Sequence, residues 1–312
     1  MSTGPMRELP PAERRAAPVR LRWTERAWVA GLAAWAVGLA LLGAALAQRP
    51  DGLLHLWALD VGQGDALLIQ TPQGGGLLID GGPDPAALER ELGRHRPFWD
   101  RGLNLLVLTH PHADHITGLI DVLAHYQVAS VLETPFQDGD RDLEDAWHGR
   151  LTLAAVPVTM AQAGQVVQVE PGLALRVLYP PSHLLQGTHS DINNASVVLR
   201  LEYGTIRMLL TGDIETEAGR ALLDAEPGGL SAQVLKVPHH GSATGLSPEL
   251  LAAIHPAVAL ISVGAKNPYG HPAANTLRLL HDAGVTTYRT DLQGTIELLS
   301  DGRQVWARPE QP

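Results

Sequence analysis

The chain has 312 residues, of which 45% are hydrophobic, enough to build one large domain or two ordinary ones around a substantial core. It contains no cysteine, which excludes disulfides and thiolate metal sites, so any metal must be held by His, Asp or Glu. Residues 1–50 hold seven Arg against three Glu, a net charge of +4; residues 51–312 hold 16 Lys and Arg against 30 Asp and Glu, a net of −14. Such a surface repels nucleic-acid phosphates unless a local groove reverses the field.

The first predicted element is a membrane segment. Residues 27–47 contain no charged side chain, and as a helix they would run about 31 Å, enough to cross a bilayer core. Six Arg precede the segment and only Arg49 closely follows it, so the positive-inside rule places residues 1–26, a predicted disordered tail, in the cytoplasm. The rest of the chain is then extracytoplasmic. We favour an uncleaved transmembrane helix over two alternatives, secretion after cleavage near Ala47 and a buried soluble helix.

After Pro50 the chain is predicted to alternate between strands and helices. Short apolar runs bounded by Gly, Pro and Asp predict strands, at 53–59, 66–70, 76–79, 103–109, 166–169, 173–179, 196–202, 206–211, 233–237, 258–263, 285–289 and 295–299. Amphipathic runs predict helices, at 85–95, 113–125, 215–225, 248–255 and 273–283. This order of elements fits an α/β fold in which two mixed sheets pack face to face with helices outside, in one domain over residues 51–312.

The most specific motif is His-Pro-His-Ala-Asp-His at residues 110–115, between a predicted buried strand and a predicted helix. His110 and His112 can converge on one cation, and Asp114 and His115 can reach a second one, which gives a site for two metals. Nitrogen and oxygen ligands suit Zn, Mn or Fe without choosing among them. The alternative is a polar turn with coincidental His, which four potential ligands in six residues disfavour.

This spacing resembles the HxHxDH signature of the metallo-β-lactamase superfamily, whose members are αββα sandwiches. The resemblance implies two divalent metal ions, Zn or Mn, and a catalytic role for Asp114. It also implies roles for three other residues. Asp80 would orient a metal ligand, Asp213 would bridge the metals and fix the attacking water, and His240 would be the last His ligand.

More narrowly, the chain resembles the extracytoplasmic hydrolase domain of the ComEC family of DNA-uptake (competence) proteins. The matching segments are 59–65, 193–199, 239–242 and 267–272, within a resemblance that runs from about residue 53 to 299. It implies a phosphodiesterase or nuclease that cleaves single-stranded DNA outside the cytoplasmic membrane. Family members also carry a multi-helix channel domain, so we do not expect this chain to transport DNA alone.

One departure from the wider superfamily concerns the first metal. That superfamily places another His before the bridging Asp, whereas this chain has Asn193, Asn194 and Ser196 in the region. The resemblance implies that these side chains shape the site through oxygen ligands or bound water, and that the first metal is weakly held or absent. His183 and His189 lie nearby, but a lone His in a loop is more often solvated.

Adjacent side chains diverge, so we expect one metal ligand from the pair His239–His240. We favour His240, because Gly241 permits close backbone approach. We then expect His239 to lie near the metal ligands or the substrate. An ordinary packing role for His239 is an equal alternative. His271 can donate a proton to a phosphate or leaving group, and the plain alternative is helix entry at that position.

Two further residues are expected to support the site. Asp65 follows Gly62-Gln63-Gly64 and is on general grounds a turn residue, which the family pattern raises to a supporting role. Lys236 lies beside the motif that contains His240, although a Lys at a strand end is usually solvated.

The charge of residues 51–312 is the main argument against a nuclease, because their cationic residues are scattered and form no basic stripe. A small-molecule or cell-envelope phosphodiesterase therefore stays open, as does a lactam or lactone hydrolase. The alternative of another class is a non-catalytic metal-binding accessory subunit of a separate membrane channel. The intact motif, with Asp213 and His240, argues against it. Residue chemistry alone predicts metal-dependent hydrolysis.

Overall fold

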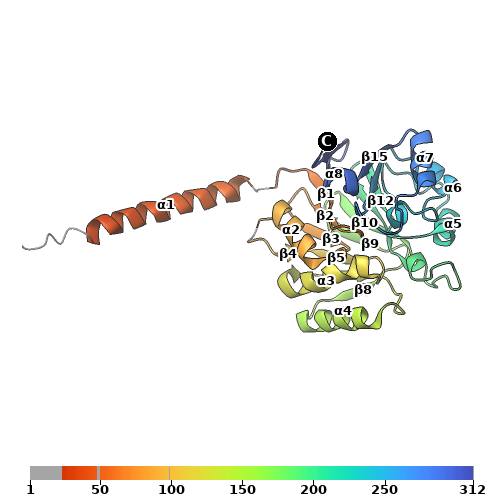
Figure 1. Ribbon diagram of the computed structural model, residues 1–312, viewed down its shortest axis with the longest axis horizontal. Coiled ribbons are helices and arrows are strands. Elements are labelled where there is room, and N and C mark those ends of the chain that lie inside the picture. The colour runs from red at the N-terminus through yellow and green to blue at the C-terminus, as the bar shows by residue number, and fades with distance from the viewer. Residues whose placement is uncertain (1–22, 48–49, 98, 312) are drawn as a thin grey trace, which may run out of the picture. The chain divides into compact units, whose positions relative to one another are not determined.

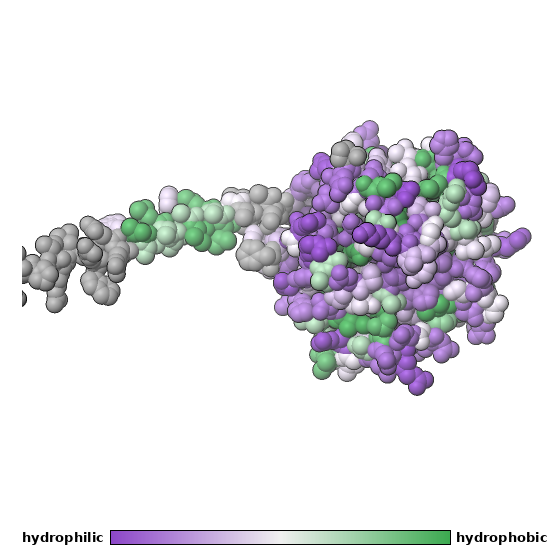
Figure 2. Space-filling view, viewed as in Figure 1, coloured by the Kyte–Doolittle hydropathy of each residue, from purple (hydrophilic) through white to green (hydrophobic). Residues whose placement is uncertain are grey.

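The computed structural model describes residues 23–47, 50–97 and 99–311. The chain divides into two units, Met1–Gln48 and Arg49–Pro312. The described part of the first unit is one helix, α1 (Trp23–Ala47), and Figure 2 shows the apolar character of its surface. Within the described ranges, no helix combines the length and the hydropathy that a membrane crossing needs. The predicted helix is thus confirmed, but its predicted membrane-spanning role is not. The predicted disordered tail lies outside the described residues, except for its last four residues, which begin α1.

The second unit contains two large sheets. The first has eight strands in the order β17-β16-β1-β2-β3-β5-β7-β8, with parallel pairing from β3 to β8 and antiparallel pairing elsewhere. Its strands are β1 (Leu54–Ala58), β2 (Leu67–Gln70), β3 (Gly76–Ile79), β5 (Leu105–Leu108), β7 (Val131–Glu133), β8 (Val158–Met160), β16 (Ile296–Ser300) and β17 (Val305–Pro309).

The second sheet has seven strands in the order β15-β14-β13-β12-β11-β10-β9, parallel from β12 to β15 and antiparallel from β9 to β12. Its strands are β9 (Val166–Glu170), β10 (Leu173–Tyr179), β11 (Val198–Tyr203), β12 (Ile206–Leu210), β13 (Val234–Lys236), β14 (Val258–Ile261) and β15 (Thr286–Arg289). A separate pair of short parallel strands consists of β4 (Gly102–Leu103) and β6 (Gln127–Val128).

The helices cover the outer faces of the sheets and complete four layers (Figure 1). Residues of α2 (Pro85–His95), α3 (Ala113–His125) and α4 (Arg141–Ala154) share one apolar cluster with the first sheet. Residues of α5 (Thr216–Ala225), α6 (Pro248–Ile254) and α7 (Ala274–Asp282) share another with the second sheet. The short elements are η1 (Asn193–Ala195), η2 (Pro238–Gly241) and α8 (Thr290–Gln293).

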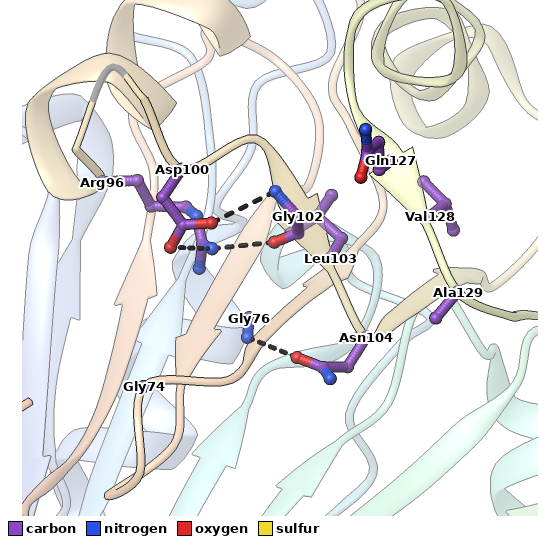
Figure 3. A pocket seen from close by; sticks show the side chains of 10 residues that line it. All are labelled: Gly74, Gly76, Arg96, Asp100, Gly102, Leu103, Asn104, Gln127, Val128 and Ala129. Carbon is purple, nitrogen blue, oxygen red and sulfur yellow. Dashed lines mark hydrogen bonds and ion pairs between the residues drawn. The ribbon is translucent and has the colours of Figure 1, made fainter.

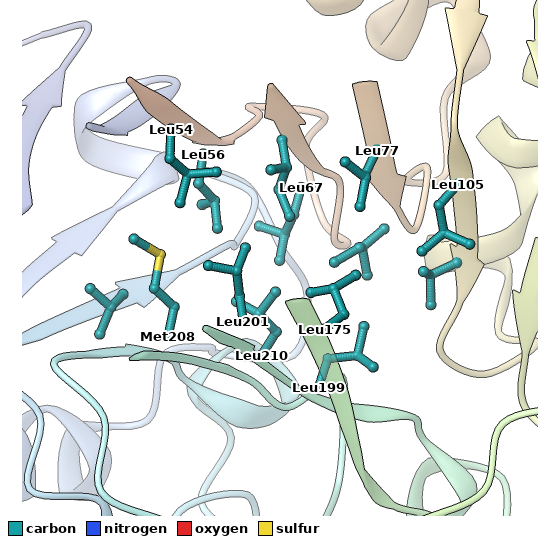
Figure 4. Packing of buried hydrophobic residues seen from close by; sticks show 14 of the residues in the cluster. Leu54, Leu56, Leu67, Leu77, Leu105, Leu175, Leu199, Leu201, Met208 and Leu210 are labelled. Atoms are coloured by element: carbon teal, nitrogen blue, oxygen red, sulfur yellow. The ribbon is translucent and has the colours of Figure 1, made fainter. Parts of the chain in front are cut away.

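The core between the sheets follows from alternation along each strand. In β1, Leu54 and Leu56 point to the space between the sheets, whereas Trp57 points to the helices. Figure 4 shows this core, where leucines of β1, β2, β3 and β5 face leucines of β10, β11 and β12. Each fully buried Leu contributes about 1.5–3 kcal/mol by leaving water, so this double-sided burial holds the two sheets together.

The structure confirms the predicted α/β sandwich and most of its elements, but six of the described strands and α-helices were missed: β6, β7, α4, β8, α8 and β17, together with the short helices η1 and η2. The helix α4 buries only Trp147 and Leu151, so its apolar stripe is too narrow to show in the pattern. β8 is exposed along its length, and β17 alternates between exposed and half-buried residues. The start of α4 does carry a readable signal, because the side chain of Asp140 accepts hydrogen bonds from the backbone of Asp142 and Leu143.

Candidate metal centre

The candidate ligands follow the carboxyl ends of parallel strands in both sheets. In the first sheet, Asp80 comes directly after β3, and the motif at 110–115 comes shortly after the neighbouring β5. In the second sheet, Asp213 follows β12 and His240 follows the neighbouring β13. Backbone donors and side chains gather at such strand ends in α/β proteins. Since the two sheets pack face to face, these ends meet and form one cluster.

His115 is held in a fixed orientation inside this cluster. Its Nδ1 lies 2.8 Å from Oδ2 of Asp80, and both side chains are buried. Asp80 is itself fixed, because its carboxylate accepts hydrogen bonds from the backbone N–H and the hydroxyl of Thr109. A carboxylate on Nδ1 places the proton there and leaves Nε2 as a ligand atom. That Nε2 lies 3.2 Å from Oδ2 of Asp213.

His240 has the same arrangement. Its Nδ1 lies 3.0 Å from the backbone oxygen of Ser262, to which it donates. Its Nε2 then points inward and lies 3.2 Å from a carboxylate oxygen of Asp114 and 3.2 Å from one of Asp213. His240 therefore belongs to the cluster, in agreement with the predicted ligand of the His pair.

His110 is buried and also turns Nε2 inward. Its Nδ1 lies 3.1 Å from the hydroxyl of Thr109 and 3.3 Å from that of Ser196. Its Nε2 lies 3.0 Å from Nδ1 of His112. All three buried His rings are thus anchored through Nδ1 and present Nε2 to the centre, the usual arrangement of His ligands on a metal.

The cluster carries a strong negative field. The cluster and its surroundings contain four carboxylates (Asp65, Asp80, Asp114 and Asp213) and one ammonium, that of Lys236 beside Asp65, which gives a net charge of −3 with neutral imidazoles. Burial by itself lowers the pKa of His115, but the surrounding carboxylates outweigh it and raise this pKa well above its ordinary value. The same balance raises the pKa of His240. The cluster therefore attracts positive charge, whether protons or metal ions.

At His110 and His112 the effect of burial on the pKa exceeds that of the neighbouring carboxylates. Burial first, and then the neighbouring His115, hold the pKa of His110 well below its ordinary value. Burial also lowers the pKa of His112. Both rings are therefore neutral near pH 7, which is the form that binds a metal.

The residues present fit divalent metal ions. Oδ1 of Asp213 and Nε2 of His240 are buried and have no partner in hydrogen-bond geometry among the described residues. Four sets of three donors lie within 4.8 Å of one another among the described residues, and two of them are His110, His115 and Asp213, and Asp114, His115 and His240. One divalent ion would change the net charge of the cluster from −3 to −1 and two would change it to +1, so either occupancy brings the cluster close to neutrality. Buried donors without partners, all of them nitrogen or carboxylate oxygen, are what a cation site requires.

The backbone is strained at the turn that carries His239 and His240. His239 and His240 adopt φ values of 47° and 52°, and Gly241 follows with 79°. Residues other than Gly pay a steric cost in this left-handed region. Asp80, at φ 57°, shares it. Three of the five described residues other than Gly with positive φ thus lie in the cluster or at its rim, and the other two, Ala155 and His255, end α4 and α6.

Asp65 and Lys236 form a buried ion pair behind His240. Nζ of Lys236 lies 2.6 Å from Oδ2 of Asp65, and each side chain is 1% exposed. Oδ1 of Asp65 lies 3.3 Å from Nδ1 of His240. The alternative of a solvated strand-end Lys is wrong here, because β13 is an interior strand and its last residue points into the protein.

Asn193 and Asn194 lie beside the cluster and support its frame. The amide of Asn193 donates to a carboxylate oxygen of Glu215, at 3.1 Å. Oδ1 of Asn194 accepts from the backbone N–H groups of Glu215 and Ala218, at 3.0 and 3.3 Å, and so caps the start of α5. Ser196 accepts from the backbone N–H of Asp213, at 3.1 Å, and contacts His110 on its Nδ1 side.

A cavity of about 290 Å³ opens onto the cluster. Its wall includes four of the candidate ligands, His112, Asp114, Asp213 and His240, together with Gln63, His239, Tyr269 and His271. The rings of His239 and His271 lie 5.5 Å apart. The predicted His271 is therefore brought to the site, whereas the loop residues His183 and His189 are exposed and lie outside the donor sets.

Three residues of the site were not singled out from the sequence. Glu215 is buried, and its carboxylate lies 3.2 Å from Nδ1 of His239. Tyr269 lies within the quoted segment 267–272 and lines the cavity. Ser262 supplies the oxygen that fixes His240. Tyr269 occupies a position in a quoted motif segment, but neither the burial of Glu215 nor the backbone oxygen of Ser262 leaves a trace in the sequence.

A larger cavity, of about 470 Å³, lies away from the cluster near β4 and β6 (Figure 3). The guanidinium of Arg96 donates there to a carboxylate oxygen of Asp100 and to the backbone oxygen of Gly102. The amide oxygen of Asn104 accepts from the backbone of Gly76. It shares no residue with the donor sets, so its size does not make it the chemical site.

Comparison with known proteins agrees with this architecture. A family model described as the metallo-beta-lactamase superfamily matches residues 59–265. ComE operon protein 3 of Bacillus subtilis is 32% identical over 256 residues, 77% of this chain and 32% of that protein. Competence protein ComA of Neisseria gonorrhoeae is 30% identical over 275 residues, 86% of this chain and 36% of that protein. The chain thus spans about a third of the length of these relatives.

Among solved structures, CmlA, a diiron beta-hydroxylase from Streptomyces venezuelae, matches with a TM-score of 0.51. The match covers 81% of this chain and 54% of that one at 15% sequence identity. At this identity the likeness supports the fold alone.

Proposed function

Since the chain belongs to the metallo-beta-lactamase superfamily, whose members are in general metal-dependent hydrolases, we propose that its second unit is a metal-dependent phosphodiesterase that cleaves single-stranded DNA. One observation carries the hydrolase part of the proposal. Three buried His rings, anchored through Nδ1, turn Nε2 toward the shared carboxylate of Asp213 at an open cavity. The similarity to competence proteins supports the choice of DNA.

The donor sets suggest how two ions would be held. In this arrangement His112, whose Nδ1 lies 3.0 Å from Nε2 of His110, takes the place of His115 in the first set. His110 and His112 with Asp213 would hold the first ion, and Asp114, His115 and His240 with Asp213 the second. Bound ions would lower the pKa of water toward neutrality and offset charge on phosphate oxygens. The second set has one more donor, because Ser196 faces the Nδ1 side of His110. We propose that the second position fills first, with Zn or Mn as the ion.

The other cavity residues would position the substrate. Asp213 is held by the hydrogen bond from its backbone N–H to Ser196, so its carboxylate has a fixed place between the two donor sets. Burial, and then the neighbouring His239 and His240, lower the pKa of His271. Its ring is therefore neutral near pH 7, and its N–H can donate a hydrogen bond to the phosphate or the leaving oxygen.

A small phosphodiester is a second candidate substrate, and the cavity itself favours it. No Lys or Arg is among the described residues that line the cavity, and the nearby Lys236 is paired with Asp65. Proteins that grip many phosphates do so with cationic side chains. A substrate with one phosphodiester would need fewer such contacts, because the metal ions themselves would bind it.

One assay separates these candidates. The full chain is loaded with Mn²⁺ or Zn²⁺ and incubated with labelled single-stranded DNA and with bis-p-nitrophenyl phosphate, and Asp213→Ala serves as the inactive control. Cleavage of both substrates by the unsubstituted chain alone supports the proposal. Cleavage of the ester without DNA supports the small phosphodiester. Metal binding without turnover of either supports an accessory subunit.

We also propose that the second unit acts outside the cytoplasm, in DNA uptake, with a separate channel protein as partner. The excess of Arg before residue 27 supports this orientation. Protease added to intact cells should then digest the second unit, and digestion only after lysis would contradict the placement.

A further inference from the structure

A row of aromatic rings leads from the rim of the cavity to the metal cluster. The ring of Tyr269 stacks on that of His271, with centroids 5.8 Å apart and planes 21° from parallel. His271 is 5.5 Å from His239, whose ring is in turn 6.0 Å from that of His240. The row therefore connects an exposed ring with one of the proposed metal ligands.

Tyr269 is 67% exposed although one face of its ring rests on His271. Single exposed aromatics are ordinary on protein surfaces. This one differs because it lines the same cavity as Asp114 and Asp213. A flat apolar surface at the mouth of a polar site is a place where a planar group of a ligand can stack.

The loop that carries Tyr269 is held in shape from within. The amide nitrogen of Asn267 donates to the backbone oxygens of Gly264 and His271, at 2.9 and 2.8 Å. Its amide oxygen accepts from the backbone N–H of His271, at 3.0 Å. One side chain thus closes the loop around Tyr269, so the ring is presented in a preorganised position and little entropy is lost when a ligand stacks on it.

Charge excludes the usual source of affinity for nucleic acid. The described lining of the cavity has no Lys or Arg, and residues 51–312 carry a net charge of −14 from 16 cationic and 30 acidic residues. Stacking of a base on an aromatic ring is the other general source of affinity for single strands, and it does not depend on charge. A paired base has both faces covered in the helix and cannot use it.

We propose that Tyr269 is a stacking platform for an unpaired nucleobase next to the phosphodiester at the metal cluster. The choice of a nucleotide as the ligand rests on the proposed function. The placement of the platform rests on the ring geometry and the loop. Tyr269 is thereby a specificity residue that distinguishes single-stranded from duplex DNA and base-bearing from abasic strands.

The test compares two strands of equal charge. Fluorescein-labelled oligothymidylate and an abasic strand of the same length, both with phosphorothioate linkages that resist cleavage, are bound to the full chain in Mn²⁺ and followed by fluorescence anisotropy. Three variants are compared: Tyr269→Ala, Tyr269→Phe, and Trp306→Ala. The last is a matched control, since Trp306 is 45% exposed in β17 and does not line the cavity.

We expect the unsubstituted chain to prefer oligothymidylate. Tyr269→Ala should lower this preference by about 5- to 100-fold, the range expected for loss of one stacked base. Tyr269→Phe and Trp306→Ala should keep the preference, and metal content should stay equal in all. Duplex DNA should compete no better than the abasic strand.

Equal binding of the two strands by the unsubstituted chain would overturn the platform, as would a Tyr269→Ala variant that loses both strands equally. These outcomes are separate from those of the cleavage assay. A base preference that depends on Tyr269 in a chain that cleaves no DNA would support the platform and overturn the proposed function. Cleavage of DNA by a chain that shows no preference for base-bearing strands would support the proposed function and overturn the platform.

Discussion

Replacement of Lys236 by Met should destabilise the protein more than any other change of a cationic residue to Met. Its ammonium lies 2.6 Å from Asp65, with both side chains 1% exposed. At an effective dielectric constant of about 20, the attraction at this distance is about 6 kcal/mol. Part of it offsets the cost of burying both charges. Removal of Lys236 leaves the carboxylate of Asp65 buried with His240 as its remaining partner, at 3.3 Å. The loss of one member of a buried ion pair costs about 3–5 kcal/mol, a large part of a total stability of about 5–15 kcal/mol.

The loss of stability caused by Lys236→Met should increase with pH. Burial raises the pKa of Asp65, but Lys236 and His240 outweigh burial and lower this pKa below its ordinary value. In the unsubstituted protein the carboxylate therefore contributes stability above about pH 3.9, the unfolded pKa, and the contribution is lost as the pH falls through the folded pKa. Without Lys236, less positive charge offsets the effect of burial, so the pKa of Asp65 rises. The loss of stability in Lys236→Met should therefore be larger at pH 8 than at pH 5.

The measurement is urea unfolding in EDTA, followed by tryptophan fluorescence, for Lys236→Met, Asp65→Asn and the double variant. Lys266→Met is the matched control, because Lys266 is the second of the two lysines and is exposed. The double variant should recover part of the loss, since no unpaired charge remains. A Lys236→Met variant within about 1 kcal/mol of Lys266→Met would refute the reasoning, because a surface pair contributes no more than that.

Three further predictions concern the metal site and its frame. Asp114→Ala or Asp213→Ala should lower metal content, measured by mass spectrometry, and abolish hydrolysis with the fold intact by circular dichroism; full occupancy in both variants would contradict the assignment. Asn194→Ala should cost about 1 kcal/mol of unfolding free energy through loss of the α5 cap, and metal content should not change. Metal affinity should rise with pH above about 6.5, because His115 and His240 have raised pKa values and must release protons; calorimetry in buffers of different ionisation enthalpy counts these protons, and a flat affinity from pH 7 to 9 would contradict it.

The sequence was sufficient to predict ligands that lie close together in the chain. The motif at 110–115 could be interpreted directly, because a turn between a buried strand and a helix brings its side chains to one place. Asp213 and His240 were predicted from the family pattern, and the structure brings both within reach of the motif. The strand ends that carry them belong to different sheets, so their meeting depends on the packing of the sandwich, which no local pattern contains.

Partners that lie far apart in the chain could not be predicted. Asp65 has the sequence context of a turn residue and Lys236 that of a solvated strand end, and only the topology makes them a pair. Asn194 lies in the region where a ligand was expected, but the structure uses its amide to cap α5. Capping needs an acceptor near the helix start, and the chain supplies it from a loop remote in sequence, so the usual signature beside the helix is missing.

The metal cluster and the residues at the cavity rim have different tasks for a physical reason. The cluster gathers carboxylates, which hold cations but repel a polyanionic substrate. Lys236 cannot offset this repulsion for the substrate, because it is buried against Asp65. Any affinity for DNA must therefore come from the metal ions, from neutral donors such as His271, and from stacking on Tyr269. It follows that binding should fall with salt much less steeply than it does for a nuclease with a basic groove, and that metal removal should weaken binding as well as abolish cleavage.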